Sequence, residues 1–257
     1  MLPSGFEILG CRFSAYGLLA ALGAFLAWLL LVRFNDREAQ PLSDGSVFAL
    51  CLMFYAAFYL GAVLLGFITV FISIPSLISG FSGSTIDWIR LVAANKSLYG
   101  GLILALCLSP FFARLMGRSM GDILRLLMPL IPFLLFFGRL GCFMSGCCYG
   151  VEADWGLCFP EGGAAPAHTP LVPTQLISAA AQLLLFVLLL VLRRRMKGEE
   201  LALVYLALYV TFRFVLEFWR GDTIPLGFLS LNQWISLTVF LFILPTWLAH
   251  RRKIHTC

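Results

Sequence analysis

The chain has 257 residues, of which 61% are hydrophobic and only 12% are charged. A typical soluble domain is about 45–50% apolar and about 25% charged, and one domain of this size cannot bury so much apolar surface in water. The composition excludes a disordered chain, a disulfide-stapled secreted module and a nucleic-acid-binding domain. It predicts a polytopic membrane protein, although the formal net charge is +5.

Seven stretches are apolar and long enough to cross a bilayer, which takes roughly 20 residues per helix. They are Tyr16–Val32, Val47–Ile72, Leu98–Met116, Ile123–Met144, Gln175–Leu192, Leu201–Phe218 and Leu231–Ala249. We therefore expect an all-α bundle of about seven transmembrane helices. Because no soluble segment of domain size is attached, residues 1–257 are expected to form a single integral membrane domain.

The basic residues predict how this bundle is oriented. Twelve of the eighteen lie in or next to the loops that follow the first, third, fifth and seventh spans, and they are Arg33, Arg37, Arg114, Arg118, Arg125, Arg193, Arg194, Arg195, Lys197, Arg251, Arg252 and Lys253. With seven spans all twelve fall on one side, which the positive-inside rule makes the cytoplasmic side. The N-terminus is then outside and the C-terminus is cytoplasmic. These charges are topology signals and do not indicate a nucleic-acid partner.

Two long loops face outward in this topology. One runs over Ser73–Asn95. The other runs over Ser145–Thr174, contains no Lys or Arg, and is rich in Gly, Ala and Pro. Loops of this length often carry function.

Arg139 is an ionisable residue at membrane depth, which is a functional hypothesis by default. Its neighbours Pro129, Pro132, Gly138 and Gly141 disfavour a regular helix. Irregular backbone at this depth is tolerated only where it is buried in protein or lines a cavity. We expect Arg139 to point into an internal, water-accessible pocket near the outer side; the alternative is an arginine that snorkels to the interface.

A second charged group lies in the sixth span. Arg213, Glu217 and Arg220 are spaced i, i+4, i+7 and share one helical face. A cavity with two or three arginines suits a phosphate group, because the guanidinium fork matches phosphate oxygens. The alternative is a structural ion pair that locks the bundle. Further hydrogen-bonding groups are available from Tyr16, Tyr99, Tyr209 and Gln175.

Four of the eight cysteines are clustered in a C-x4-C-C-x9-C pattern: Cys142, Cys147, Cys148 and Cys158. They fall on the predicted outer side, where disulfides are permitted. Three interpretations remain open, namely a structural disulfide, a reactive thiol or thiol pair activated by nearby arginines, and a metal site. The spacing is not a standard zinc pattern, and the nearby histidine is His168, so no metal and no other cofactor is expected.

Several motifs resemble those of the prolipoprotein diacylglyceryl transferase family. Gly138-Arg139-Leu140-Gly141 through Gly146 and Gly150 resembles its G-R-x-G-N-F-x-N-G-E-x-x-G signature. The remaining matches follow in family order along nearly the whole chain: Arg12 with Tyr16-Gly17, Tyr99-Gly100-Gly101-Leu102, Trp155-Gly156 with Phe159-Pro160, Pro173-Thr174-Gln175-Leu176, Arg213 through Glu217 and Arg220 to Asp222, and Ser230 with Gln233. Seven spans with the N-terminus outside is also the family's arrangement.

The resemblance implies a reaction and a set of roles. Such enzymes move the diacylglyceryl group of phosphatidylglycerol onto the lipobox cysteine of a secreted precursor, in the bacterial cytoplasmic membrane, and release glycerol phosphate. Arg139 and Arg213 would hold the phosphate, and Tyr99 and Glu217 would join them as catalytic residues. Substrate-binding residues would be Tyr16, Gly100, Gly101, Gly138, Gly141, Gly146, Gly150, Tyr209, Arg220 and Gln175.

The chain departs from the family pattern mainly at polar groups. Tyr99 stands at the family's histidine, Cys142 and Ser145 at its two asparagines, and Cys147 at its glutamate. The general base and the acceptor are therefore left open. Besides a transferase acting on a lipobox precursor or another thiol acceptor, two hypotheses remain: a non-catalytic lipid- or peptide-binding membrane protein, and an outward-facing thiol oxidoreductase that uses the cysteine cluster.

Overall fold

The structure is a computed structural model that describes residues 6–8, 11–73, 97–223 and 225–255. Of the predicted loop Ser73–Asn95, Ser73 is described and the remaining residues lie outside the described part of the chain. The described chain is mostly helical, as the composition predicts. Its helices are α1 (Ala15–Asn35), α2 (Asp44–Ser73), α5 (Leu98–Leu115), α6 (Met120–Leu127), α7 (Leu130–Ser145), α8 (Thr174–Leu192), α9 (Gly198–Leu216), the short 3-10 helix η1 (Glu217–Trp219) and α10 (Leu231–His255).

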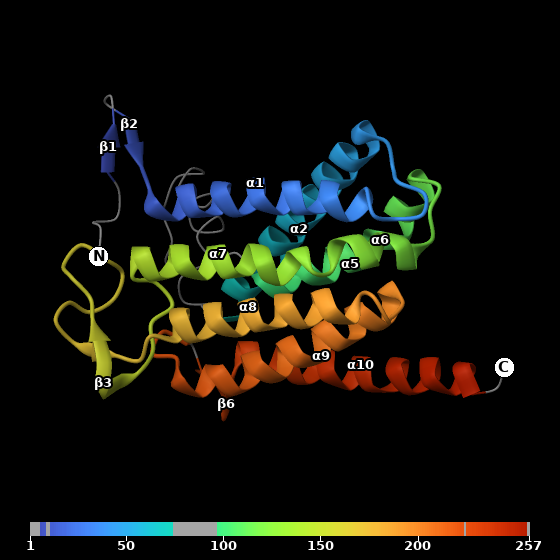
Figure 1. The fold of residues 1–257 in the computed structure, drawn as a ribbon. Helices are drawn as coiled ribbons and strands as arrows, with labels where there is room; N and C mark the ends of the chain where they lie inside the picture. The colour runs from blue at the N-terminus through green and yellow to red at the C-terminus, as the bar shows by residue number, and fades with distance from the viewer. Residues whose placement is uncertain (1–5, 9–10, 74–96, 224, 256–257) are drawn as a thin grey trace. The chain divides into compact units, whose positions relative to one another are not determined.

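The described residues also form three short antiparallel strand pairs. They are β1 (Phe6–Ile8) with β2 (Cys11–Phe13), β3 (Glu152–Cys158) with β4 (Pro170–Leu171), and β5 (Pro225–Leu226) with β6 (Leu229–Ser230). The second pair lies at the end of the helices where α7 ends and α8 begins (Figure 1).

Six helical segments of the described chain are long and apolar enough to cross a membrane. They are Ala15–Asn35, Asp44–Ile68, Leu98–Leu115, Met120–Ser145, Thr174–Leu192 and Gly198–Trp219. These correspond to the first six predicted spans. At the seventh predicted position α10 forms a helix, whose described apolar part is the shorter stretch Leu231–Ile243. The chain is thus a multi-pass helical membrane protein, and the seventh span and the orientation remain predictions.

The chain divides into two compact units, and the larger one comprises Met1–Phe34 and Leu124–Cys257. Within it α7 packs against α8, α8 against α9, and α9 against α10 (Figure 1). The rings of Phe133 on α7 and Phe186 on α8 are 4.8 Å apart. Glycines let α1 approach α7 closely, because a Cβ on Gly141 would lie 2.7 Å from the Tyr16 ring. Many outward side chains of α8 are exposed leucines and valines, which suits a lipid-facing surface.

The smaller unit, Asn35–Ile123, is built on the packing of α2 against α5. Gly61 on α2 and Gly100 on α5 face each other so closely that a Cβ on either would collide with the other's carbonyl oxygen. Such small-residue contacts are the usual way for membrane helices to approach without a hydrophobic driving force. Gly101 meets Phe58 in the same way. Tyr99, Gly100 and Gly101 therefore belong to a helix-packing seam of this unit.

The prediction of irregular backbone around Arg139 is wrong, because α7 is a continuous α-helix from Leu130 to Ser145. Pro129 occupies the N-cap and Pro132 lies in the first turn. The N–H that proline lacks has no intrahelical partner at these positions, so neither ring interrupts the helix. The helix is interrupted between α6 and α7, and Arg139 lies in a regular part of α7.

Candidate functional site

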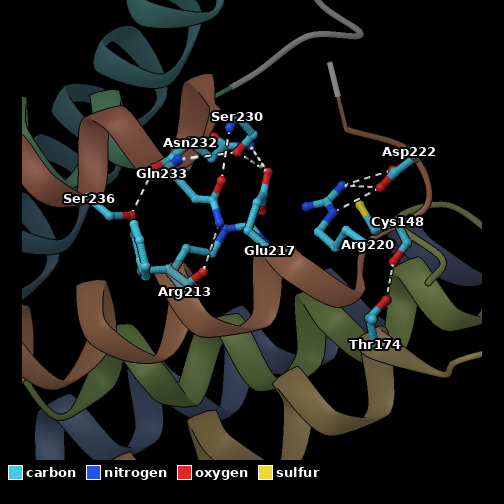
Figure 2. A network of polar contacts seen from close by, with 11 residues as sticks. Cys148, Thr174, Arg213, Glu217, Arg220, Asp222, Ser230, Asn232, Gln233 and Ser236 are labelled. Carbon is cyan, nitrogen blue, oxygen red and sulfur yellow. Dashed lines mark hydrogen bonds and ion pairs between the residues drawn. The ribbon is translucent and has the colours of Figure 1, made fainter. Parts of the chain in front are cut away.

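A buried ion pair links Arg213, near the end of α9, to Glu217 in η1. The Arg213 Nη2 atom lies 2.9 Å from Glu217 Oε2, and the two side chains are only 7% and 1% exposed. The other carboxylate oxygen accepts hydrogen bonds from Ser230 Oγ (3.0 Å) and Asn232 Nδ2 (2.9 Å), as Figure 2 shows. Ser230, just before α10, and Asn232, in its first turn, therefore fix the carboxylate, and the carboxylate fixes the arginine.

The same network includes the first turn of α10. Gln233 Oε1 accepts a hydrogen bond from the Ser230 backbone N–H (2.9 Å), and Gln233 Nε2 donates to the Phe214 carbonyl oxygen (3.4 Å). Asn232 was not among the predicted site residues. The polar run Ser230-Leu231-Asn232-Gln233 directly before an apolar span was the signal that could have identified it.

Arg220 has a carboxylate partner of its own. Its Nε and Nη2 atoms donate to the two carboxylate oxygens of Asp222 at 2.8 Å each, a bidentate pair that leaves the side chains 10% and 25% exposed (Figure 2). Glu217 therefore pairs with Arg213, and Asp222 with Arg220. The charged residues expected on one face of the sixth span thus form two ion pairs, in each of which a carboxylate neutralises an arginine.

Arg139 differs from both of these arginines. Among the described residues, no carboxylate forms an ion pair with its guanidinium. Arg139 interacts electrostatically with Cys142, Cys147, Cys148 and Tyr209. Tyr209 in turn lies within electrostatic range of Arg213 and Arg220 as well. The site therefore carries an excess positive charge, and Arg139 supplies it.

The loop that follows α7 is anchored on both sides. Gly146 ends the helix in the left-handed conformation (φ 70°), which glycine adopts without strain. The backbone N–H of Gly150 donates to the Val172 carbonyl (3.0 Å), and the Gly221 N–H donates to the Tyr149 carbonyl (3.1 Å). A Cβ on Gly150 would lie 2.5 Å from the Val172 carbonyl oxygen, so only glycine fits there.

Two polar residues at the start of α8 hold the cysteine pair itself. Thr174 Oγ1 donates to the Cys148 carbonyl (2.6 Å), and Gln175 Nε2 donates to the Cys147 carbonyl (2.9 Å). Gln175 is buried, and its Oε1 has no hydrogen-bond partner among the described residues. Cys148 is one of two described non-glycine residues with positive φ (61°), a conformation that a β-carbon disfavours. The fold thus holds this residue in a strained backbone.

Three of the four clustered cysteines converge. The Sγ atoms of Cys142, Cys147 and Cys148 all lie within 4.8 Å of one another, and each thiol is half-buried. No disulfide joins these cysteines or Cys158 in the described chain. Hydrogen bonds from the Cys142 and Cys147 thiols, helped by the positive charge of Arg139 and Arg220, lower the pKa of Cys148 below its ordinary value.

Cys158 lies apart from this cluster, exposed at the end of β3. Its neighbour Phe159 is buried against Ala165 and Leu171, and the Phe159 ring contacts the Phe143 ring of α7 edge-on at 5.9 Å. The loop Ser145–Thr174 is thereby packed onto the end of α7.

The other predicted residues are divided between the two units. In the larger unit, Tyr16 covers Gly141, whereas nothing lies within 4 Å of a Cβ on Gly138. Tyr209 stacks on Tyr205 at 5.8 Å. Gly100 and Gly101 pack helices in the smaller unit, where Tyr99 is buried beside them.

Comparison with known proteins identifies the family of this site. A family model described as "Prolipoprotein diacylglyceryl transferase" matches residues 3–249. The chain belongs to the prolipoprotein diacylglyceryl transferase family.

Named relatives agree with this family assignment. A protein of Clostridium perfringens named phosphatidylglycerol--prolipoprotein diacylglyceryl transferase 2 is 30% identical over 246 residues, 91% of this chain and 90% of its own length. Proteins named phosphatidylglycerol--prolipoprotein diacylglyceryl transferase from Methylococcus capsulatus (31% identical; 86% of this chain, 82% of the relative) and Geobacter sulfurreducens (29% identical; 98% and 96%) are also similar. The resemblance inferred from the motifs is confirmed, and these relatives are named as enzymes.

Proposed function

We propose that this protein transfers the diacylglyceryl group of phosphatidylglycerol to the lipobox cysteine of a precursor protein. Membership of the prolipoprotein diacylglyceryl transferase family supports this activity, since the relatives are named for these two substrates. The same proposal includes the bacterial cytoplasmic membrane as its location and seven spans with the N-terminus outside. The placement of the basic residues supports that orientation.

The observation that carries the proposal is Arg139 without a carboxylate partner among the described residues. An arginine whose charge is not neutralised is available for an anionic ligand, and its planar fork fits phosphate oxygens. Arg213 adds a second donor, because its Nη1 atom is buried without a hydrogen-bond partner in the described chain. Burial of Arg213 makes its contact with an anion stronger than it would be in water, because the interior has a lower dielectric constant.

The reaction needs this arrangement because a phosphate is the leaving group. The acceptor sulfur attacks the glycerol carbon that carries the phosphate ester, a carbon–sulfur bond forms, and the carbon–oxygen bond breaks with its electron pair going to glycerol phosphate. Negative charge grows on the departing oxygen. Cations fixed beside it stabilise the transition state more than the ground state, which is the condition for catalysis. Arg139 and Arg213 would supply those cations, and Glu217 would position Arg213.

The test is a transfer assay in lipid nanodiscs that contain phosphatidylglycerol. A lipobox peptide is added, and mass spectrometry looks for a diacylglyceryl adduct on its cysteine and for released glycerol phosphate. We expect both products. Binding of the lipid without either product by a folded sample would instead indicate a non-catalytic binding protein.

The role of Arg139 is tested in the same assay. Removing one electrostatic donor from an active site lowers turnover by about 10²–10³-fold, and we expect a loss of this size for Arg139→Ala. Arg195→Ala is the matched control, since Arg195 is an exposed arginine after α8. Full activity of Arg139→Ala would contradict the phosphate-binding role.

A further inference from the structure

The three converging thiols occupy positions where the family signature has other groups. Cys142 stands at an asparagine and Cys147 at the glutamate of that signature, while Tyr99 replaces its histidine. At these positions the chain has neither the histidine nor the glutamate of the signature, and it has gained a set of sulfur ligands. The mutual distances of at most 4.8 Å bring those sulfurs to one point beside Arg139.

The geometry fits a four-coordinate ion that has one position open. Zinc binds thiolate sulfur at about 2.3 Å in a tetrahedron, which sets neighbouring sulfurs about 3.8 Å apart. A small contraction of the cluster reaches that spacing. A disulfide would use two of the thiols and leave the third unexplained, whereas a metal ion uses all three. In the described chain the group consists of cysteines alone, so the fourth position is left for an outside ligand.

The charges around the cluster also favour a divalent ion. Three thiolates and Zn²⁺ carry a net charge of about −1, and Arg139 is the adjacent guanidinium that lacks a carboxylate among the described residues. Arg220 already has Asp222 as its counter-charge. The divalent ion therefore cancels most of the negative charge of the three thiolates and lowers the desolvation penalty of the half-buried cluster, while the guanidinium of Arg139 stays able to bind the phosphate.

The chain holds its ligands in place before any ion binds. Cys142 is on the last turn of α7, whose C-terminal carbonyl groups favour a cation. Thr174 and Gln175 fix the Cys148 and Cys147 carbonyls. Outer-shell contacts of this kind commonly orient metal ligands. This explains why Cys148 is kept in a backbone conformation that it would otherwise avoid.

We propose that Cys142, Cys147 and Cys148 bind a zinc ion whose open fourth position takes the thiol of the acceptor cysteine. The inference rests on the proposed transferase function. In this proposal the metal ion generates the thiolate nucleophile. The cysteines at the signature's asparagine and glutamate positions then take over the activation of the acceptor thiol.

A thiol that coordinates zinc loses its proton outright, and this proton goes to water. The bound sulfur then forms a bond to the glycerol carbon as the carbon–oxygen bond breaks, and the electron pair leaves with glycerol phosphate. The product is an uncharged thioether, a weak ligand, so it leaves the ion and restores the open position. No oxidant or reductant takes part.

The first test measures metal binding without any need for activity. The protein is purified under reducing, metal-free conditions, titrated with Co²⁺ as a spectroscopic probe, and then with Zn²⁺. We expect one ion per chain, a sulfur-to-cobalt charge-transfer band, and loss of that band on adding zinc. Cys148→Ser should lose the band, and Cys158→Ser should keep it, because Cys158 lies outside the cluster. A fully reduced, folded protein that gives no band, or a native disulfide within the cluster, would overturn the proposal.

The second test asks whether the fourth position takes the acceptor. A lipobox peptide should shift and intensify the cobalt band as a fourth sulfur binds, and the same peptide with Ser in place of Cys should not. The transfer assay is then run on the zinc-free and zinc-loaded protein. We expect activity only with the ion. Full transfer without metal would overturn this inference while the proposed function stands. A peptide-responsive metal site with no transfer would overturn the proposed function while the site stands.

Discussion

The Arg213–Glu217 pair offers a direct test of how the larger unit is stabilised. In Glu217→Gln, the amide oxygen can still accept hydrogen bonds from Ser230 and Asn232, so the change removes the charge and little else. Arg213, whose side chain is 7% exposed, then loses its counter-charge. Breaking a buried ion pair by removing one partner costs about 3–5 kcal/mol, so we expect Glu217→Gln to lose stability of that order.

Two controls separate charge from hydrogen bonding. Ser230→Ala removes one hydrogen bond to the same carboxylate and should cost about 1 kcal/mol. Asp222→Asn breaks the more exposed Arg220 pair, so we expect a smaller loss than for Glu217→Gln. A double variant, Arg213→Met with Glu217→Leu, removes both buried charges and should recover most of the lost stability.

Stability is measured by reversible unfolding in mixed micelles, followed by tryptophan fluorescence, and transfer activity is measured on the same samples. If Arg213 also binds phosphate, the double variant is stable but inactive. A cost below about 1 kcal/mol for Glu217→Gln would refute the reasoning, because it would place the pair in a well-solvated environment.

Four further variants test the packing of the larger unit in the same unfolding assay. Gly138→Ala should stabilise the protein by about 0.5–1 kcal/mol, because the added Cβ on α7 meets no other atom. Gly141→Ala should destabilise it by about 1–3 kcal/mol, because the added Cβ meets the Tyr16 ring. Equal effects of the two substitutions would contradict the packing of α1 against α7. Gln175→Leu leaves the Cys147 carbonyl unpaired and should cost about 1–3 kcal/mol, and unchanged stability would show that another group replaces the amide. Phe159→Ala opens a cavity beside Phe143 and should lower the free energy of unfolding by about 3–5 kcal/mol. A loss as small as that of a surface substitution would mean that the loop does not pack on α7.

The sequence alone determined the class of the protein and its family. Apolar stretches of membrane length can be read from composition, because a span must satisfy its backbone internally and face lipid with apolar side chains. Six of the predicted spans correspond to helices of the described chain. The glycine and arginine spacing around Arg139 resembled the family signature, and the family model that matches residues 3–249 confirmed the resemblance.

The tertiary structure decided what those residues do to one another. Prolines near Arg139 suggested a broken helix, but their place in the first turn of α7 makes them harmless, and only the helix start fixes that place. Helical spacing allowed Glu217 to pair with either arginine; the polypeptide beyond η1 selected Arg213 by bringing Ser230 and Asn232 to the carboxylate. The convergence of Cys142, Cys147 and Cys148 depends on the left-handed turn at Gly146 and on two hydrogen bonds from α8. Those two hydrogen bonds join residues 26 and 28 positions apart in the chain, and sequence spacing does not reveal them.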